Sequence, residues 1–472
     1  MRRYLVQTFG CQMNVHDSRR IEEVLDAAGW SATDEPTLAD MVVFNTCSVR
    51  EKAEHKLMSA LGTVRPLKDQ GRPVVLAVAG CVAQQEGVRL LKSAPYVDVV
   101  IGPDNIAELP GLALAASEGA APIARTEFDV HAPSFLDATP RRDGSEVTAF
   151  VTVMKGCDER CTYCVVPYTR GPERYRSADD IVGEIRAMVA GGVREVTLLG
   201  QTVNSWFDPT RAHGASEVPP RWDAELARTS EFASLLRRIA SEVPELERLR
   251  YTSPHPRHLT DDLILAHAEL DVLAKHVHLP VQSGNDRVLK RMLRRYTRAL
   301  YLERVAKLED AVPGLTLSTD IIVGFPGETE AELEDTLSLI EQAGFVAAFG
   351  FKYSPRPHTP SRKLVDDVPE EEKAARLERV FEVVARQQSA HLASLVGSDV
   401  RVLIELRSRG DEGRFLGRSE RNEIVHVLGR EGDDLRGSIV TARVEQANRH
   451  SLMGRTPDAP ERRASLRLPV VA

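Results

Sequence analysis

The first three cysteines of this 472-residue chain each come after a short apolar run that is typical of a buried β-strand. The pairs are Leu5–Phe9 before Cys11, Met41–Phe44 before Cys47 and Val74–Ala79 before Cys81. Helix-like stretches separate these runs, and strands that alternate with helices predict a parallel sheet covered on both faces. Because the carboxyl ends of parallel strands share one edge, we expect the three cysteines to converge there.

This alternation extends to about residue 115 and predicts a doubly wound α/β unit. The predicted strands are Tyr4–Thr8, Met41–Phe44 and Pro73–Ala79, and the predicted helices are Val15–Ala28, Glu51–Leu61 and Ala83–Lys92. Gly29 is expected to end the first helix as its C-cap. Residues 116–144 are rich in Ala, Pro, Ser and charge without a period, so we expect a linker.

A second strand–helix series starts at Thr148 and predicts a partial barrel of six β/α units, because the remaining residues are too few for eight. The predicted strands are Thr148–Met154, Glu195–Leu199, Leu249–Thr252, His276–Pro280, Leu317–Val323 and Phe345–Phe351. The predicted helices include Ala178–Ala190, Ser230–Glu242 and Glu328–Ala343. Residues 208–226 are expected to form an insertion loop.

The last part of the chain changes from helical to β patterns. A long helix is predicted over Glu370–Leu395. Short strands separated by Gly and Asp are predicted over Asp399–Leu406, Phe415–Arg418, Ile424–Val427 and Ser438–Gln446. This pattern is typical of a small antiparallel barrel.

The other three cysteines, Cys157, Cys161 and Cys164, lie on one short loop after the first strand of the partial barrel. Soft thiolate ligands suit iron, and three of them can hold three irons of a 4Fe-4S cluster and leave the fourth open. The alternative is zinc, but structural zinc takes four ligands and no second cysteine pair follows. The N-terminal three indicate a second cluster, with three buried free cysteines as the alternative.

Composition sets further limits. Six cysteines, none after Cys164, argue against a disulfide framework. The N-terminus lacks the apolar stretch of a signal peptide, and no apolar run is long enough to cross a membrane, so we expect a cytoplasmic protein with no membrane partner. The net charge of −8 does not indicate nucleic-acid binding, although a net charge can hide a local basic patch.

The Cys157–Cys164 motif and its setting resemble the radical S-adenosylmethionine (SAM) superfamily. Three N-terminal strings, Thr8–Asn14, Asn45–Ala53 and Ala79–Cys81, and the longer string from Cys157 to Gly171 resemble the methylthiotransferases of that superfamily, most closely the bacterial tRNA-modifying branch. The C-terminal barrel resembles the RNA-binding TRAM domain. The implied division is an N-terminal domain over 1–115, a linker over 116–144, a radical SAM core over 145–375, a connecting helix over 376–396, a TRAM domain over 397–460 and a tail over 461–472.

The resemblance implies methylthiolation of C2 of N6-isopentenyladenosine at position 37 of tRNA. Cys157, Cys161 and Cys164 would hold the 4Fe-4S cluster that cleaves SAM to a radical, and Cys11, Cys47 and Cys81 would hold a second 4Fe-4S cluster that carries the sulfur. A second SAM would donate the methyl group. A C2–H bond has no acidity useful to a base, so a radical is the fitting reagent. The implied partners are the tRNA anticodon loop, a reductant such as a flavodoxin or ferredoxin, and the iron–sulfur assembly machinery.

Several residues are candidates for contact with SAM. The resemblance places Tyr163 and Gly324 near the adenine and Gln201 near the amino group, where the superfamily usually has an acidic residue. Ser253 and Gln282 follow predicted strands at the barrel mouth, the usual active face. Each is also consistent with an ordinary strand-end turn. His358 stands where the family usually has glycine, which leaves pocket detail open.

A basic run over Asp286–Arg298 is the local patch that the net charge hides. Its candidate RNA-binding residues are Arg287, Arg291, Arg294 and Arg298, which fall at helical spacing. Six cations beside a proposed pocket favour contact with a phosphate backbone over a merely solvated face. Two other functions remain open, which are methylthiolation of a ribosomal protein and a non-enzymatic iron–sulfur protein that binds RNA.

Overall fold

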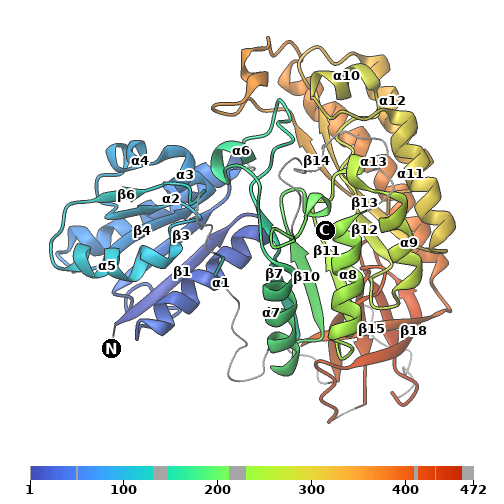
Figure 1. Ribbon diagram of the computed structural model, residues 1–472, viewed down its shortest axis with the longest axis horizontal. Coiled ribbons are helices and arrows are strands. Elements are labelled where there is room, and N and C mark those ends of the chain that lie inside the picture. The colour runs from blue at the N-terminus through green and yellow to red at the C-terminus, as the bar shows by residue number, and fades with distance from the viewer. Residues whose placement is uncertain are drawn as a thin grey trace, which may run out of the picture.

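The computed structural model describes residues 2–48, 51–130, 135–136, 146–211, 230–408, 413–430 and 432–459. They form an N-terminal sheet with helices, an open half-barrel and a small C-terminal barrel (Figure 1). The expected α/β class, with its three parts, is confirmed. The described helices include none with the length and apolar character needed to span a lipid bilayer.

The N-terminal sheet has six parallel strands in the order β2-β1-β3-β4-β5-β6. Their bounds are β1 Arg3–Phe9, β2 Ser31–Ala32, β3 Met41–Thr46, β4 Val75–Gly80, β5 Val99–Ile101 and β6 Ile123–Arg125. Every residue of β3 and β4 is buried, which explains why these strands are continuous apolar runs. The three strands that precede the cysteines are therefore neighbours at the centre of the sheet.

Helices cover both faces of this sheet, as predicted. They are α1 Gln12–Ala27, α2 Glu51–Asp69, α3 Cys81–Glu86, α4 Val88–Ser93 and α5 Leu109–Ser117, preceded by the short η1 Ile106–Glu108. One core packs Ile21 and Leu25 of α1 with Leu109 of α5, and the other packs Leu57 and Leu61 of α2. The predicted Ala83–Lys92 helix is two helices, broken at Gly87, whose φ is +49°. The C-cap of the first helix is Ala28, and Gly29, at φ +82°, follows it one residue later than predicted.

The segment predicted as a linker contains a strand that the sequence pattern did not reveal. Ile123–Arg125 forms β6 and pairs in parallel with β5. Three residues are too few to show the alternation of a strand, so the Ala-, Pro- and Ser-rich composition of the segment led to the prediction of a linker.

The half-barrel consists of two three-stranded parallel sheets, β7-β10-β11 and β12-β13-β14, joined by a bridge between Leu249 and Leu273. The bounds are β7 Thr148–Thr152, β10 Glu195–Leu199, β11 Arg248–Tyr251, β12 His276–His278, β13 Thr316–Val323 and β14 Ala347–Lys352. A hairpin, β8 Met154–Lys155 with β9 Arg174–Tyr175, encloses the cysteine loop and α6 Val166–Thr169. All six predicted strands are present within a few residues of their expected bounds. Of the predicted insertion loop, 212–226 lies outside the described residues.

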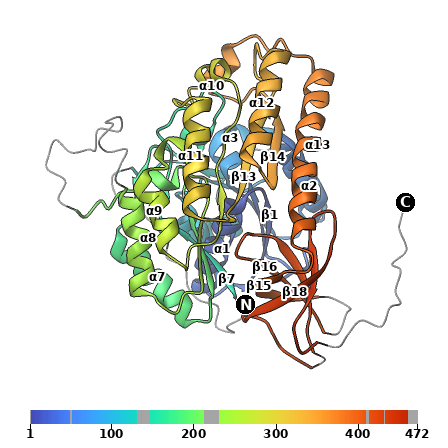
Figure 2. The same ribbon diagram turned by 90° about the vertical axis from the view of Figure 1, so that its right-hand side faces the viewer.

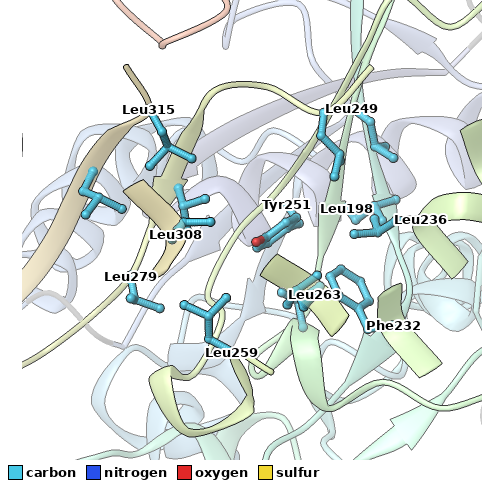
Figure 3. Packing of buried hydrophobic residues seen from close by; sticks show 14 of the residues in the cluster. Leu198, Phe232, Leu236, Leu249, Tyr251, Leu259, Leu263, Leu279, Leu308 and Leu315 are labelled. Carbon is cyan, nitrogen blue, oxygen red and sulfur yellow. The ribbon is translucent and has the colours of Figure 1, made fainter. Parts of the chain in front are cut away.

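The outer face of the half-barrel is covered by helices. They are α7 Ala178–Ala190, α8 Glu231–Glu242, α9 Asp261–Glu269, α10 Asp286–Arg291, α11 Arg298–Ala311, α12 Glu330–Ala343 and α13 Glu370–Ser394, with short turns η2 Val203–Ser205, η3 Pro256–His258 and η4 Pro360–Lys363. Helix α8 is amphipathic, because its apolar residues Phe232, Leu236 and Ile239 lie on one buried face. Figure 3 shows Phe232 and Leu236 packed with Leu198 of β10. This one core fixes the strand ends that carry the site.

The C-terminal barrel is closed in the order β15-β16-β17-β19-β18. Its strands are β15 Asp399–Arg407, β16 Arg414–Ser419, β17 Ile424–Leu428, β18 Ile439–Ala447 and β19 Leu452–Arg455. The prediction of an antiparallel barrel is wrong in one pair, since β19 closes the barrel by pairing in parallel with β17. Four residues with one glycine gave β19 too short a pattern to be predicted.

This small barrel is attached to the half-barrel at the end where the parallel strands begin (Figure 2). Arg248, the first residue of β11, donates to the Arg418 carbonyl at 3.0 Å. Thr316, the first residue of β13, donates to the Arg421 carbonyl at 2.8 Å. The cysteine loop follows β7 and β8 at the opposite end. The C-terminal barrel and the cysteine loop are thus separated by the length of the strands, about 20 Å for six residues.

Candidate functional site

The N-terminal cysteines lie together at the carboxyl edge of the sheet. Cys11 is the N-cap of α1 after β1, Cys47 follows β3, and Cys81 begins α3 after β4. The Cys47 N–H donates to the Phe9 carbonyl at 3.0 Å, and the Cys11 and Cys47 side chains are hydrogen-bonded. The expectation that three successive strand ends bring these thiols to one edge is confirmed by the strand order.

Small residues and two amides make this close approach possible. Gly10 has φ +155°, and a Cβ there would lie 2.6 Å from Cys47 Cβ. Gly80 has φ +89°, and a Cβ there would overlap the Asn45 side chain. Asn45 is fully buried and accepts a 3.1 Å hydrogen bond from Asn14 Nδ2. These contacts hold the ends of β1, β3 and β4 at a fixed spacing.

A cation from the half-barrel completes the N-terminal site. Arg170, which follows α6, is buried, donates to both carboxylate oxygens of Asp17 at 3.2 and 2.5 Å, and contacts Cys81. Burial has the largest single effect and raises the pKa of Asp17, but the Arg170 charge and the hydrogen bonds from His16 and Arg170 together outweigh it and hold that pKa far below its usual range. A second contact joins Thr152 Oγ1 to His16 Nε2 at 3.1 Å.

The N-terminal thiols differ in protonation. The hydrogen bond from Cys47, opposed by burial and assisted by Arg170, lowers the pKa of Cys11 to about 6. Burial raises the pKa of Cys81, although Arg170 opposes the shift. Because thiolates are the metal-binding form, the site offers one ready ligand and a cation that tolerates further negative charge.

The half-barrel cysteines lie on the loop between β8 and α6. The Cys157 N–H donates to the Gly171 carbonyl at 3.2 Å, and Cys157 Sγ lies 3.0 Å from Thr202 Oγ1. Arg294 Nη1 donates to Cys161 Sγ at 3.4 Å. Burial raises the pKa of Cys157 and raises that of Cys164 to about 12, so these thiols become ligands when a metal ion deprotonates them.

Both cysteine sets fit an iron–sulfur cluster better than a single metal ion. Sulfur atoms bound at about 2.3 Å to one tetrahedral zinc lie about 3.8 Å apart. Among the described residues, which include all six cysteines, the group whose ligand atoms all lie within 4.8 Å of one another is Glu159, His255 and His258. Neither complete cysteine set meets this limit, although the Cys11 and Cys47 side chains lie within hydrogen-bonding distance of each other. Three thiolates without a fourth protein ligand match the number that holds three irons of a 4Fe-4S cluster.

The Glu159 group is better explained as a clamp on the cysteine loop. Glu159 Oε1 lies 2.8 Å from His258 Nε2, and Arg257 Nη1 lies 3.7 Å from the other carboxylate oxygen. Burial raises the pKa of Glu159, but the His258 hydrogen bond and these charges lower it overall. A metal ion would compete with the Arg257 cation, so an ion pair with η3 suits this carboxylate.

The candidate RNA-binding arginines do not form one exposed helical face, and that interpretation is wrong. Helix α10 ends at Arg291 and α11 begins at Arg298, while Leu293 and Arg295 between them have positive φ. Arg294 is buried and donates to Cys161 and to the Pro280 carbonyl, the latter at 3.0 Å. The sequence showed the charge, but not the turn that directs this side chain inward.

The other three arginines differ in how free they are. Arg287 donates to Glu332 at 2.5 and 2.6 Å. Arg298 donates to Gly284 and Ser338, at 3.2 and 3.1 Å. The Arg291 side chain is exposed, and no ion pair ties it to another described residue. Of the four candidates, Arg291 is the one available to a partner.

The candidate SAM-contacting residues gather at the strand ends around the cysteine loop. Gln201 follows β10, and its Oε1 accepts from the Gly156 N–H at 2.5 Å, while its Nε2 is buried without a partner among the described residues. Ser253 and Gln282 follow β11 and the end of β12 with φ of +60° and +73°. Such strained conformations often mark functional sites. Gln282 is buried and its N–H donates to the Asp320 carbonyl at 2.8 Å.

Two further candidates lie on the other side of the loop. Tyr163 packs against a small cluster that includes Met292 and Phe325. Gly324 follows β13 at φ +67°, and a Cβ there would overlap the Lys373 side chain. Gly324 therefore already meets a protein side chain, which explains its conformation without a ligand.

Sequence reasoning did not assign roles to Arg170, Asp17 and Thr202, and it assigned Arg294 to RNA binding rather than to the cysteine loop. Arg170 lies within the motif Cys157–Gly171, and Thr202 directly follows the candidate Gln201. Their closeness to these sites was the only feature of the sequence that pointed to them. No such feature pointed to Asp17, because its partner lies 153 residues away.

Comparison with known proteins finds family matches for each of the three parts of the chain. Residues 3–102 match the "Uncharacterized protein family UPF0004", residues 151–340 the radical SAM superfamily and residues 393–456 the TRAM domain. A radical S-adenosylmethionine methyltransferase from Kitasatospora setae has a similar fold, with a TM-score of 0.50 at 14% identity over 76% of this chain and 75% of that one. The chain is a radical SAM enzyme, a class that uses a 4Fe-4S cluster and SAM.

Curated relatives narrow the class. The chain is 56% identical to a tRNA-2-methylthio-N(6)-dimethylallyladenosine synthase from Sorangium cellulosum, over all of this chain and 99% of that protein. It is 46% identical to the protein of the same name from Myxococcus xanthus, over 96% of this chain and 94% of that protein. The chain belongs to the family of tRNA-2-methylthio-N(6)-dimethylallyladenosine synthases.

Proposed function

We propose that this enzyme methylthiolates C2 of N6-isopentenyladenosine at position 37 of tRNA, using two SAM molecules. The observation that carries the proposal is the pair of three-cysteine sites, one in the radical SAM half-barrel and one at the edge of the N-terminal sheet. The names of the full-length relatives support it. When bound, the half-barrel cluster supplies an electron that cleaves SAM to a radical, and the N-terminal cluster supplies the sulfur.

The half-barrel residues hold and orient SAM. Cys157, Cys161 and Cys164 leave one iron of a 4Fe-4S cluster open to the methionine moiety. The Gln201 side-chain oxygen already accepts a hydrogen bond from the Gly156 N–H, so it does not accept from the SAM amino group. The buried amide nitrogen of Gln201 is free to donate a hydrogen bond to the SAM carboxylate. Tyr163, Ser253, Gln282 and Gly324 remain the proposed lining, with Gly324 the weakest because Lys373 already fills the space beside it.

The N-terminal residues hold the second 4Fe-4S cluster. Cys11, Cys47 and Cys81 supply three thiolates, and the buried Arg170 compensates their negative charge. Without that cation, three thiolates in a buried site would carry a large desolvation cost. Because Arg170 comes from the half-barrel, this cluster site is complete only when the two parts are in contact.

The tRNA contacts both ends of the half-barrel in this proposal. The TRAM domain lies at the strand-start end and the cysteine loop at the other, so a partner that reaches both must be extended. Arg291 is the proposed phosphate contact among the four candidate arginines, because Arg287, Arg294 and Arg298 are engaged within the protein. A stem with its anticodon loop has the required length.

The remaining proposals concern context. We place the enzyme in the cytoplasm, with a flavodoxin or ferredoxin as reductant and the iron–sulfur assembly machinery as cluster donor, since buried thiols must stay reduced to bind iron. The proposed division stays at 1–115, 116–144, 145–375, 376–396, 397–460 and 461–472, with β6 inside the second of these segments.

The test is an assay of anaerobically reconstituted protein with SAM, reductant and isopentenylated tRNA. The expected products are 5′-deoxyadenosine and a methylthiolated nucleoside found by mass analysis of digested tRNA. A protein that forms no 5′-deoxyadenosine is the non-enzymatic iron–sulfur protein instead. A protein that cleaves SAM and modifies a ribosomal protein but no tRNA contradicts the substrate assignment.

A further inference from the structure

Two exposed aromatic side chains from distant segments meet beside the cysteine loop. Tyr168 on α6 is 44% exposed, and its ring centroid lies 5.8 Å from that of His358, which is also exposed. The other phenyl or phenol rings exposed among the described residues are Phe349 and Phe381, on β14 and α13. An exposed pair of rings is a costly surface, since each ring keeps apolar area in water.

The backbone at His358 adds to this cost. Its φ is +67°, a conformation that is uncommon for residues other than glycine, although histidine adopts it more readily than most. The residue follows Pro357 in a turn closed by the Thr359 N–H and the Arg356 carbonyl at 3.3 Å. Proline at the second position and a positive φ at the third match a type II turn, which favours glycine at the third position. The chain thus keeps an imidazole where glycine would be easier to accommodate.

The cysteine loop itself anchors the segments around this pair. The Thr162 carbonyl accepts from the Ser361 N–H at 2.9 Å, which fixes η4 just beyond His358. The Thr162 N–H and hydroxyl donate to the Met292 and Arg291 carbonyls at 3.0 and 2.9 Å, which fixes the end of α10. Tyr168 lies four residues after Cys164 on the other arm of the loop. The aromatic pair therefore stands on the rim of the half-barrel cluster site.

The two segments that Thr162 holds, the end of α10 and η4, carry exposed cations. Lys290 and Arg291 end α10, and Arg362 and Lys363 end η4. No ion pair joins these four side chains to an acidic residue within the described part of the chain. Exposed rings with flanking cations are the arrangement by which proteins hold single-stranded nucleic acid, since every base has a π-face and every nucleotide a phosphate.

We propose that Tyr168 and His358 form a stacking platform for an unpaired RNA base next to the reacting nucleotide, with Lys290, Arg291, Arg362 and Lys363 holding its phosphates. The inference rests on the proposed tRNA substrate and names the surface that receives the loop. Single-stranded loops are recognised by splaying bases onto aromatic side chains. The platform would hold a neighbouring base while the target adenosine enters the site.

The test uses an anticodon stem–loop RNA with 2-aminopurine next to the target adenosine and the cluster-loaded full chain. His358→Gly removes the ring and relieves the turn. We expect about tenfold weaker RNA binding and loss of stacking-induced quenching, while the melting temperature stays equal or rises. Tyr168→Leu should weaken binding similarly, and Tyr168→Phe should restore it. Phe381→Ala is the matched control, an exposed ring on α13 that should leave binding unchanged.

The outcomes separate this inference from the function on which it rests. Wild-type RNA affinity and quenching in both His358→Gly and Tyr168→Leu would overturn the platform and leave the enzyme assignment intact. Failure of the wild-type protein to bind the stem–loop would overturn both. If only the melting temperature moved, the pair would be a structural contact and the platform would be rejected. Uncoupled SAM cleavage without RNA, measured as 5′-deoxyadenosine, should be the same in all four variants.

Discussion

Each of the two cysteine sites presents three thiols, but the two sites are built in opposite ways. The half-barrel set lies on one loop of eight residues, and its supporting contacts, from Thr202 and Arg294, come from the same half-barrel. The N-terminal set is assembled from three strand ends and completed by Arg170 from another part of the molecule. A three-cysteine site can therefore be a local motif or a product of tertiary and interdomain packing, and only the first is visible as a single short motif in the sequence.

The two sites also differ in charge before any metal binds. At the N-terminal site the pKa of Cys11 is lowered to about 6, with Arg170 close by. At the half-barrel site burial raises the pKa of Cys164 to about 12. The N-terminal site thus offers one acidified thiol, Cys11, although burial raises the pKa of its Cys81, whereas Cys157 and Cys164 both rely on a metal ion to deprotonate them.

The interdomain pair should carry the largest single stability effect. Asp17→Asn leaves the buried Arg170 without its counter-charge, and removing one partner of a buried pair costs about 3–5 kcal/mol. Urea unfolding of the metal-free protein measures the loss. The N-terminal site should also lose iron, while the half-barrel site keeps it.

The pH dependence follows from the lowered pKa of Asp17. The pair contributes fully above the ordinary aspartate pKa of about 4, and the contribution is lost as the pH falls further towards the folded-state value. The stability gap between wild type and Asp17→Asn should therefore narrow below about pH 4. A gap that widens there would show that the charge of Asp17 does not stabilise the fold.

The half-barrel site should respond to Arg294 without affecting the other site. Arg294→Met removes the donor to Cys161 and Pro280, and hydrogen bonds from a charged group are worth about 1.5–3 kcal/mol. We expect weaker iron retention at this site in chelator challenge, with the N-terminal iron unchanged. Arg291→Met, three residues earlier and exposed, is the control. Equal iron loss in both variants would contradict the assigned role of Arg294.

A smaller effect is expected at Thr202. Thr202→Val keeps the shape of this buried side chain but removes the hydroxyl next to Cys157, which should cost about 1 kcal/mol. Thermal unfolding measures it. Stability equal to wild type would mean that the hydroxyl does not support the cysteine loop.

The smallest effect separates two arginines that look alike in sequence. Arg291→Gln should lower the slope of log affinity for tRNA against log salt by about one, as one phosphate contact is lost. Arg287→Gln removes an ion pair with Glu332 and should cost at most about 1 kcal/mol of stability without changing the slope. If Arg287→Gln changed the slope and Arg291→Gln did not, the assignment of the free cation would be reversed.

The sequence predicted elements with long periods or full apolar runs and missed short ones. The six half-barrel strands and α7 were predicted because buried strands and amphipathic helices leave strong patterns. Strands β6 and β19, of three and four residues, left too little pattern. The convergence of Cys11, Cys47 and Cys81 could be predicted because parallel topology alone fixes where strands end.

Side-chain direction in irregular segments could not be predicted. Arg294 was expected on an exposed helical face, but positive φ at Leu293 and Arg295 turns it towards Cys161. The Arg170–Asp17 pair depends on how the N-terminal sheet packs against the half-barrel, which no local pattern encodes.

The division of labour between the two cysteine sites is tested most directly by two triple variants. In one, Cys157, Cys161 and Cys164 become Ala, and in the other, Cys11, Cys47 and Cys81 become Ala. Each reconstituted protein is analysed for iron, 5′-deoxyadenosine and methylthiolated nucleoside. Both should retain about half of the wild-type iron, since each keeps one cluster. The first variant should form no 5′-deoxyadenosine, and the second should form it without methylthiolating tRNA. Identical behaviour of the two variants would contradict the account.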